Sequence, residues 1–189
     1  TSNRDLKSIQ FSGLRKIGYD VVGNIAIIKF DRNTTLIMKK RFASSYLAKN
    51  KSVTTVLEKV GKFSGRLRTL KTRWLAGFKT KEALYRENGC EFRFNVDTCY
   101  FSPRLSEERK KVAGFVKRGE RVLVMFGGVA PFAIVIAKLS KAGKVVSVEL
   151  GRECSKYALE NVKRNKLNNV EIVQGDVRKK LKGSKEKFD

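Results

Sequence analysis

The sequence contains no histidine, and it has only three cysteines and two prolines. Without histidine, Ser-His and Cys-His nucleophilic mechanisms and histidine acid–base catalysis are excluded. The cysteines, Cys90, Cys99 and Cys154, are widely spaced and form no CxxC pair, so a zinc site with the usual ligands is nearly excluded. We expect them to be reduced core residues in a reducing compartment. Chemistry would then rely on carboxylates, arginines, backbone amides or a cofactor.

Long apolar runs are also missing. No run approaches the roughly 20 residues that cross a bilayer. The first ten residues, TSNRDLKSIQ, are too polar for a secretory signal, and no lipidation motif is present. We therefore expect a cytoplasmic protein that has no membrane partner.

Positive charge, by contrast, is abundant. Forty-two Lys and Arg residues against 18 Asp and Glu give a formal net charge of +24. Such an excess repels itself unless a polyanion is near, which makes phosphate backbones the natural partner. A lysine-rich surface with no specific partner is the alternative. We expect the protein to bind nucleic acid.

One basic stretch is the candidate RNA contact. It runs from Lys62 to Arg73 (KFSGRLRTLKTR), with Phe63 and Trp74 as aromatic neighbours. Arginines neutralise phosphates, and aromatic rings can stack on unpaired bases. A charged β-hairpin face is the alternative. The residues predicted to bind RNA are Arg66, Arg68, Lys71 and Arg73.

The first 98 residues predict a small α+β module with mostly antiparallel pairing. Residues Gly18–Phe30 are rich in β-branched side chains and predict one or two strands with a kink at Gly23. Apolar spacing predicts a helix over Thr34–Lys49, capped by Thr34 or Thr35. Further strand-like pieces follow at Ser52–Val60, Gly65–Leu75, Lys81–Glu87 and Cys90–Val96.

Residues 99–189 alternate between helix and strand patterns. After a helix over Ser102–Lys117, the predicted strands are Arg121–Phe126, which reads as buried, Lys144–Leu150 and Val170–Gln174. The predicted helices are Phe132–Leu139, Glu153–Leu167 and Val177–Lys182. This order predicts a parallel sheet of right-handed βαβ units. Three strands do not complete a doubly wound domain, and an exposed parallel strand is unusual. We expect either a fragment of a longer chain or a protein or ribosomal partner that covers the sheet edge.

Three features fall at the carboxyl ends of the three strands, where open α/β sheets bind ligands. Gly127 and Gly128 would let the backbone and the amides of the following helix approach a ligand. Glu149 could accept hydrogen bonds from ribose hydroxyls, and Asp176, after Gly175, from an adenine amino group. Singly, these are a turn, a solvated carboxylate and an N-cap. Together they favour an adenosine cofactor. The absence of GxGxxG argues against a dinucleotide oxidoreductase.

Several longer motifs are more specific. RENG at Arg86–Gly89 and FRFNVDTCYFSPRLSEER at Phe92–Arg109 resemble the signature that joins the small and catalytic domains of the archaeal and eukaryotic tRNA guanine-37 N1-methyltransferase family. VLVMFGGVAPFAIVIAK, from Val122, resembles that family's cofactor strand and loop, usually DMFAGVGPF. Matching segments also begin at Gly18, Val148 and Glu160. Wybutosine-pathway transferases share these motifs.

The resemblance implies an incomplete Rossmann-like class I methyltransferase domain, preceded by the small RNA-binding domain. It also implies methyl transfer from S-adenosylmethionine to N1 of the guanosine beside the anticodon of tRNA. A carboxylate must then remove the N1 proton, and an arginine stabilises charge on O6. By motif, Arg109 is the O6 stabiliser, Arg104 is a second basic candidate, and Glu149 is either the base or a ribose ligand. The cofactor residues implied are Phe126, Gly127, Gly128, Pro131, Phe132, Glu149, Asp176 and Val177.

The sequence departs from the family pattern at three places. Val124 occupies the usual acidic position of the first strand, and Gly151-Arg152 replaces the usual Asn-Pro. Ala130 replaces a loop glycine, which costs little only if its φ is negative. The family's proline-containing catalytic loop is absent. Two hypotheses follow: a tRNA methyltransferase that lacks its C-terminal catalytic portion here, or a non-catalytic RNA-binding relative, a scaffold associated with tRNA or the ribosome.

Overall fold

The computed structural model describes residues 18–62, 64–182 and 186–189. By packing, the chain divides into two compact units, residues 1–60 with 72–80 and residues 61–71 with 81–189. The division predicted from the sequence, 1–98 and 99–189, concerns functional domains and stays a prediction. Phe63 and the polar first residues lie outside the described part.

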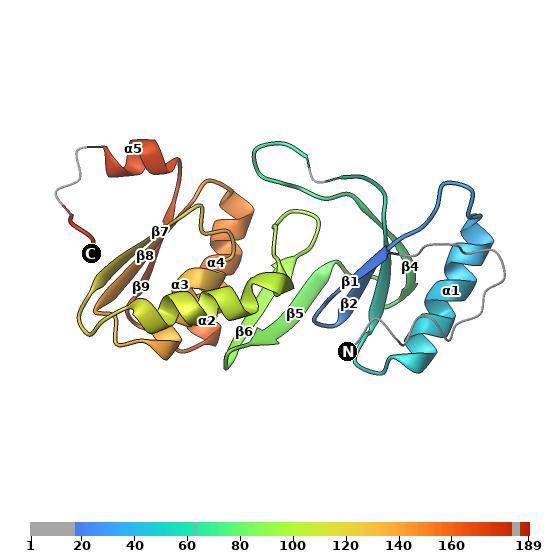
Figure 1. Ribbon diagram of the computed structural model, residues 1–189. Coiled ribbons are helices and arrows are strands. Elements are labelled where there is room, and N and C mark those ends of the chain that lie inside the picture. Colours follow the sequence, from blue (N-terminus) through green and yellow to red (C-terminus); the bar gives the residue numbers. More distant parts are fainter. Residues whose placement is uncertain (1–17, 63, 183–185) are drawn as a thin grey trace. The chain divides into compact units, whose positions relative to one another are not determined.

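The first unit is a four-stranded sheet with one helix against it (Figure 1). The strands, in the order β1-β2-β3-β4, are β1 (Gly18–Val22), β2 (Ile25–Lys29), β3 (Thr55–Lys59) and β4 (Thr72–Gly77). Only the β2–β3 pair is parallel. The predicted kink is confirmed, because Gly23 has a positive φ of 57° in the β1–β2 turn. The predicted mostly antiparallel pairing is confirmed as well.

The helix of this unit is α1 (Leu36–Lys49). Thr35, one of the two predicted caps, accepts a hydrogen bond from the Met38 backbone N–H at 3.3 Å. Phe42 and Tyr46 are buried in one cluster with Ile28 of β2 and other apolar side chains of the sheet. The apolar face of α1 therefore closes the core of the unit.

The basic stretch Gly65–Leu75 is not the strand that the sequence predicts. Only Ser64 and Thr69 form an isolated bridge, and β4 begins at Thr72. Gly65 and Arg68 have positive φ values of 68° and 51°, which a strand does not accommodate. Residues 64–69 therefore form a tight turn.

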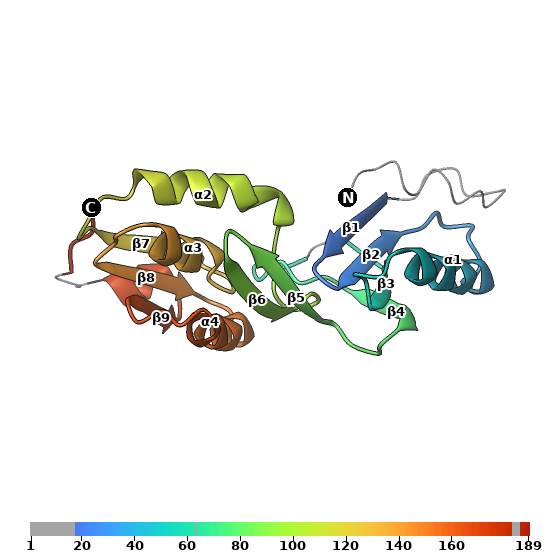
Figure 2. The same ribbon diagram turned by 90° about the horizontal axis from the view of Figure 1, so that it is seen from below.

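The second unit begins with the antiparallel hairpin β5 (Glu82–Glu87) and β6 (Cys90–Asn95). The short 3-10 helix Pro103–Leu105 and α2 (Ser106–Phe115) follow. The parallel sheet then has the order β7-β8-β9, and the predicted alternation of strands and helices is confirmed (Figure 2). Its elements are β7 (Arg121–Met125), α3 (Pro131–Leu139), β8 (Lys144–Glu149), α4 (Arg152–Arg164), β9 (Val170–Gln174) and α5 (Val177–Leu181).

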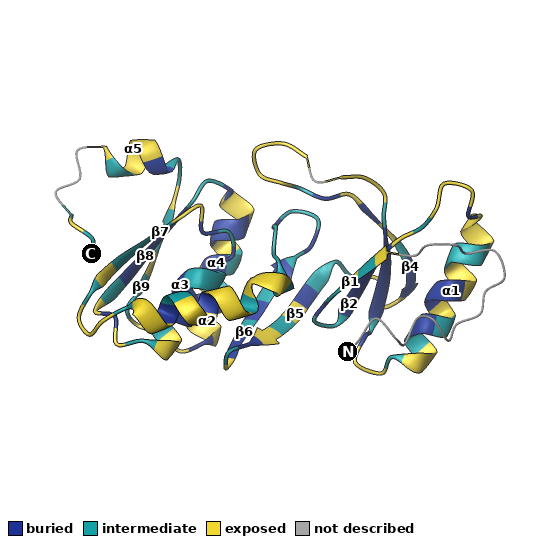
Figure 3. Cartoon of the chain, in the orientation of Figure 1, coloured by how far each residue is buried: buried dark blue, intermediate teal, exposed yellow. Residues whose placement is uncertain are grey.

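The prediction of a buried first strand is wrong. In β7 the side chains are half-buried or exposed, whereas in the neighbouring strand β8 Val145 and Val148 are buried (Figure 3). The reason is position, because β8 lies between two strands and β7 lies at the edge of the described sheet. On one face of the sheet, Val177 of α5 packs on Val146 and Val148.

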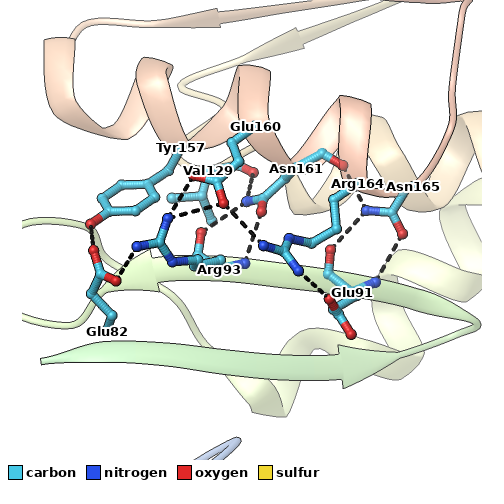
Figure 4. Close-up of polar contacts among 9 residues, drawn as sticks. All are labelled: Glu82, Glu91, Arg93, Val129, Tyr157, Glu160, Asn161, Arg164 and Asn165. Carbon is cyan, nitrogen blue, oxygen red and sulfur yellow. Dashed lines mark hydrogen bonds and ion pairs between the residues drawn. The ribbon is translucent and has the colours of Figure 1, made fainter. Parts of the chain in front are cut away.

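Two asparagines, Asn161 of α4 and Asn165 directly after it, hold the hairpin in place (Figure 4). Asn161 accepts from the Arg93 backbone N–H at 2.8 Å and donates to the Arg93 carbonyl at 3.1 Å. Asn165 accepts from the Glu91 backbone N–H at 2.9 Å and donates to the Glu91 carbonyl at 2.7 Å. Asn161 also donates to the Val129 carbonyl at 3.3 Å. The side-chain amides thus satisfy β6 as a neighbouring strand would.

The expectation that all three cysteines are reduced is wrong for one pair. Cys99 and Cys154 form a disulfide with their Cα atoms 5.5 Å apart. The sequence could not reveal it because the two are 55 residues apart and meet only when the segment after β6 lies at the first turn of α4. Cys90 is free and buried, and burial raises the pKa of its thiol to about 11.

The described residues contain no cluster of three or more His, Cys, Asp or Glu side chains that could hold a metal ion. None of the helices they form is long and apolar enough to cross a membrane.

Candidate functional site

A cavity of about 890 Å³ opens at the carboxyl ends of β7, β8 and β9. This is the rim of a parallel sheet at which ligands bind, and the volume suits a nucleoside-sized molecule. All of its lining residues belong to the second unit. Every cofactor residue expected from the sequence lies in this lining: Phe126, Gly127, Gly128, Pro131, Phe132, Glu149, Asp176 and Val177.

The turn after β7 has an unusual backbone. Phe126, Gly128 and Ala130 all have positive φ values, 58°, 57° and 64°. A Cβ on Gly127 would lie 2.0 Å from the Ser147 hydroxyl, so this position requires glycine. Phe126 is 75% exposed, and a bulky residue in the left-handed region is a strained feature of the kind found at functional sites.

The amides of this turn are largely used within the protein. Gly127 donates to the Val148 carbonyl and Ala130 to the Gly127 carbonyl, both at 2.9 Å. The sequence prediction concerned the amides of the following helix start, which these bonds do not involve. The bonds stiffen the turn, and Gly127 and Gly128 line the cavity beside the Phe126, Pro131 and Phe132 side chains.

Glu149, at the end of β8, binds backbone amides of two loops, the one after β7 and the one before α4. One carboxylate oxygen accepts from the Gly128 N–H at 2.8 Å, and the other from the Gly151 N–H at 2.6 Å. Each oxygen keeps a further lone pair for a donor in the cavity. Such a carboxylate suits an acceptor of hydroxyl groups better than a general base.

Asp176 is the N-cap of α5 and accepts from the Arg178 backbone N–H at 3.0 Å. Its other oxygen is bound by the Arg66 guanidinium at 2.8 Å. The hydrogen bond from Arg66, and to a smaller extent the one from the Arg178 amide, lowers the pKa of Asp176 below its usual value. Asp176 is therefore an ionised acceptor at neutral pH.

Arg109 lies in the cavity wall and is 1% exposed. It forms a two-bond ion pair with Glu87, of which the Nη2–Oε2 bond is 2.6 Å, and it donates to the Ser102 carbonyl at 3.1 Å. The rings of Phe101 and Phe132 lie 5.0 and 5.7 Å from its guanidinium carbon. This motif-predicted residue is thus held rigidly at the cavity.

The other predicted residues are distributed more widely. Arg104 is exposed on the short 3-10 helix and lies outside the cavity lining. Arg66 and Arg68 line the cavity, Lys71 belongs to the same unit, and Arg73 belongs to the first unit, 3.8 Å from Glu58. The structure therefore does not bring all four predicted RNA residues into one unit.

Comparison with known proteins places these features in a family. The family model described as the TRM5/TYW2 methyltransferase domain matches residues 83–188. The chain belongs to this family.

The chain is similar to proteins named as tRNA methyltransferases. It is 38% identical to tRNA (guanine(37)-N(1))-methyltransferase Trm5b of Pyrococcus abyssi, over 85% of this chain and 48% of that protein, and the crystal structure of that protein matches with a TM-score of 0.76. The chain spans about half the length of the curated relatives it matches.

Two solved complexes are also similar. The complex of aTrm5 and tRNALeu has a TM-score of 0.79 and 28% identity, covering 88% of this chain and 49% of that one. The crystal structure of M. jannaschii TYW2 in complex with AdoMet matches with a TM-score of 0.61 and 27% identity, covering 85% of this chain and 57% of that one.

Of the departures from the TRM5/TYW2 motif, one lies in the cavity wall. Val124 lines the cavity at the position that is acidic in the motif. The φ of Ala130 is positive, so the substitution for glycine is strained by about 1–2 kcal/mol. Gly151 still supplies an amide to Glu149.

Sequence reasoning missed part of the cavity wall. Tyr100, Phe101 and Leu105 line it, and so does Leu67 from the distant loop. The first three lie within the motif segment Phe92–Arg109, so the signal was present. Nothing in the sequence indicated Leu67. It reaches the cavity only because its loop, about 80 residues before β8 in the chain, folds back against the sheet rim.

Proposed function

We propose that this protein is an S-adenosylmethionine-dependent tRNA methyltransferase that acts on N1 of the guanosine beside the anticodon. The observation that carries the proposal is the cavity at the carboxyl rim of the parallel sheet, with Glu149 and Asp176 both on its wall. Membership of the TRM5/TYW2 family and the similarity to a tRNA complex and an AdoMet complex support it.

The cofactor fits the residues present. Ribose hydroxyls would donate to Glu149, which already accepts one amide bond at each oxygen. The adenine amino group would donate to Asp176, and the apolar wall from Phe126, Pro131, Phe132 and Val177 would pack on the ligand. When bound, S-adenosylmethionine supplies a methyl group on a positively charged sulfur.

The protein's own residues would make N1 of the guanine reactive. Proton removal from N1 shifts negative charge to O6, and a fixed cation beside O6 lowers the barrier. Arg109 is suited to this role because Glu87 and the Ser102 carbonyl fix its orientation in the cavity wall. We assign Glu149 to ribose binding rather than to proton removal, since both its oxygens already accept backbone amides. The N1 proton would then pass to another carboxylate or to water. Arg104 stays a second basic candidate.

The RNA partner follows from charge. With a net charge of +24, the protein favours a polyanion, and Arg66, Arg68, Lys71 and Arg73 are the proposed contacts. We further propose that residues 1–98 serve as the small RNA-binding domain, that residues 99–189 carry the methyltransferase fold, and that the protein works in the cytoplasm.

The test is methyl transfer from tritiated S-adenosylmethionine, by the protein at its full length, to a tRNA transcript with guanosine at position 37. We expect label in the RNA as 1-methylguanosine, and none in a transcript already methylated at that N1. Label in another nucleoside would contradict the proposed target. Bound RNA with neither label nor cofactor binding would favour the alternative, a non-catalytic RNA-binding relative, for which Val124 at the motif's acidic position is the specific observation.

A further inference from the structure

The loop Gly61–Lys71 carries a small closed turn. Ser64 and Thr69 exchange backbone hydrogen bonds of 2.9 and 3.0 Å, and the Arg68 N–H donates to the Gly65 carbonyl at 3.1 Å. Three consecutive residues at the tip of this turn, Arg66, Leu67 and Arg68, line the cavity. The loop that supplies the predicted RNA contacts therefore also forms part of the wall of the cavity.

Two further contacts hold the turn to the rest of the second unit. The Leu70 N–H donates to the Asp97 carbonyl at 2.7 Å, and the Arg68 guanidinium lies 4.2 Å from the Tyr100 ring centroid. A cation over an aromatic ring is a favourable contact. The position of Arg66 is thus set by its neighbours and not by one ion pair alone.

Arg66 lines the cavity beside Asp176, so its guanidinium stands where an adenine amino group would approach that carboxylate. One oxygen of Asp176 accepts the Arg178 amide, and the other accepts Arg66 at 2.8 Å. The Asp176 side chain is 23% exposed, whereas that of Arg66 is 76% exposed. The guanidinium therefore touches the cavity with one nitrogen while most of it faces solvent, where a phosphate could reach it.

We propose that Arg66 is a gate shared by two ligands: the adenine amino group displaces Arg66 from Asp176, and the released guanidinium binds a phosphate of the RNA. The inference rests on the proposed function and adds to it a coupling between the two binding steps. Because coupling is reciprocal, RNA would also favour cofactor binding. An exposed ion pair is weak, so the coupling is about two- to fivefold.

The experiment measures both ligands on three proteins: the unmodified chain, Arg66→Ala and Lys71→Ala. S-adenosylhomocysteine is titrated calorimetrically, and tRNA binding is measured by anisotropy with and without saturating S-adenosylhomocysteine. Arg66→Ala should bind S-adenosylhomocysteine about two- to fivefold more tightly and tRNA more weakly. Lys71, exposed in the same loop and outside the cavity lining, is the matched control, and its variant should weaken tRNA binding alone.

The second readout is the increase in tRNA affinity that saturating S-adenosylhomocysteine causes. It should be present in the unmodified protein and in Lys71→Ala, and absent in Arg66→Ala. Unchanged or weaker S-adenosylhomocysteine binding by Arg66→Ala would overturn the gate and leave the proposed function standing. If the unmodified protein gave no binding heat with S-adenosylhomocysteine, the gate and the proposed function would fail together.

Discussion

At the scale of single residues, the buried ion pair of Arg109 and Glu87 connects stability with the cavity. The two side chains are 1% and 3% exposed and are joined by two hydrogen bonds. Removing one partner of such a pair leaves an uncompensated buried charge, whereas removing both does not. The pair therefore fixes the position of Arg109, and the protein loses stability when only one of the two partners is removed.

We predict that Arg109→Met lowers the free energy of unfolding by about 3–5 kcal/mol, measured by urea denaturation. The double variant Arg109→Met/Glu87→Gln should recover a large part of this loss, because no charge then remains buried. Lys110→Met, at an exposed neighbouring position, is the control. A single variant that unfolds like the control would show that the pair is not buried as described.

The residues of the cavity wall could be predicted from the sequence where they follow strands. Gly127, Glu149 and Asp176 were expected at one rim, and the cavity contains all three. The partners of these residues could not be predicted. The Glu149 bonds to two backbone amides and the Arg66–Asp176 pair, 110 residues apart, depend on how loops fold back.

At the scale of elements, the hairpin β5–β6 is held by side chains and not by a further strand. At the outer edge of β6, the side-chain amides of Asn161 in α4 and of Asn165 directly after it each bind one backbone N–H and one backbone carbonyl (Figure 4). Because Asn161 also binds the Val129 carbonyl, it connects the hairpin to the turn after β7. One side chain thus positions two elements of the cavity.

We predict that Asn161→Asp lowers the free energy of unfolding by about 2–4 kcal/mol, since a carboxylate cannot donate to the Arg93 and Val129 carbonyls. Thermal or urea unfolding measures the effect. Asn168→Asp, exposed after the same helix, introduces the same charge and should change stability little. Equal effects of the two substitutions would refute the role of Asn161 in holding β6 and the turn after β7.

Most elements were predictable because their signals are local. Apolar spacing and the Thr35 cap gave α1, and the alternating pattern gave the parallel strands. The turn at residues 64–69 was missed because backbone conformation at Gly65 and Arg68 overrides a strand-like composition. The low burial of β7 was missed because the order of strands in a sheet is not a property of any one strand.

At the scale of the whole molecule, charge and fold point to the same partner class. A net charge of +24 favours a polyanion, and the chain belongs to the TRM5/TYW2 family and is similar to proteins named as tRNA methyltransferases. Composition alone indicated a nucleic acid. The fold and the family narrow the proposed partner to tRNA, and the cavity adds the proposed methyl donor.

The central claim is that the cavity at the sheet rim binds an adenosyl ligand through Glu149. Calorimetric titration with S-adenosylhomocysteine tests it most directly. We predict saturable binding to one site, which Glu149→Gln weakens by roughly tenfold or more, because the two amide bonds and the ribose bonds all use the carboxylate. Glu153→Gln, an exposed neighbour, should bind as the unmodified protein does. No binding heat, or equal affinity in the Glu149→Gln variant, would contradict the account.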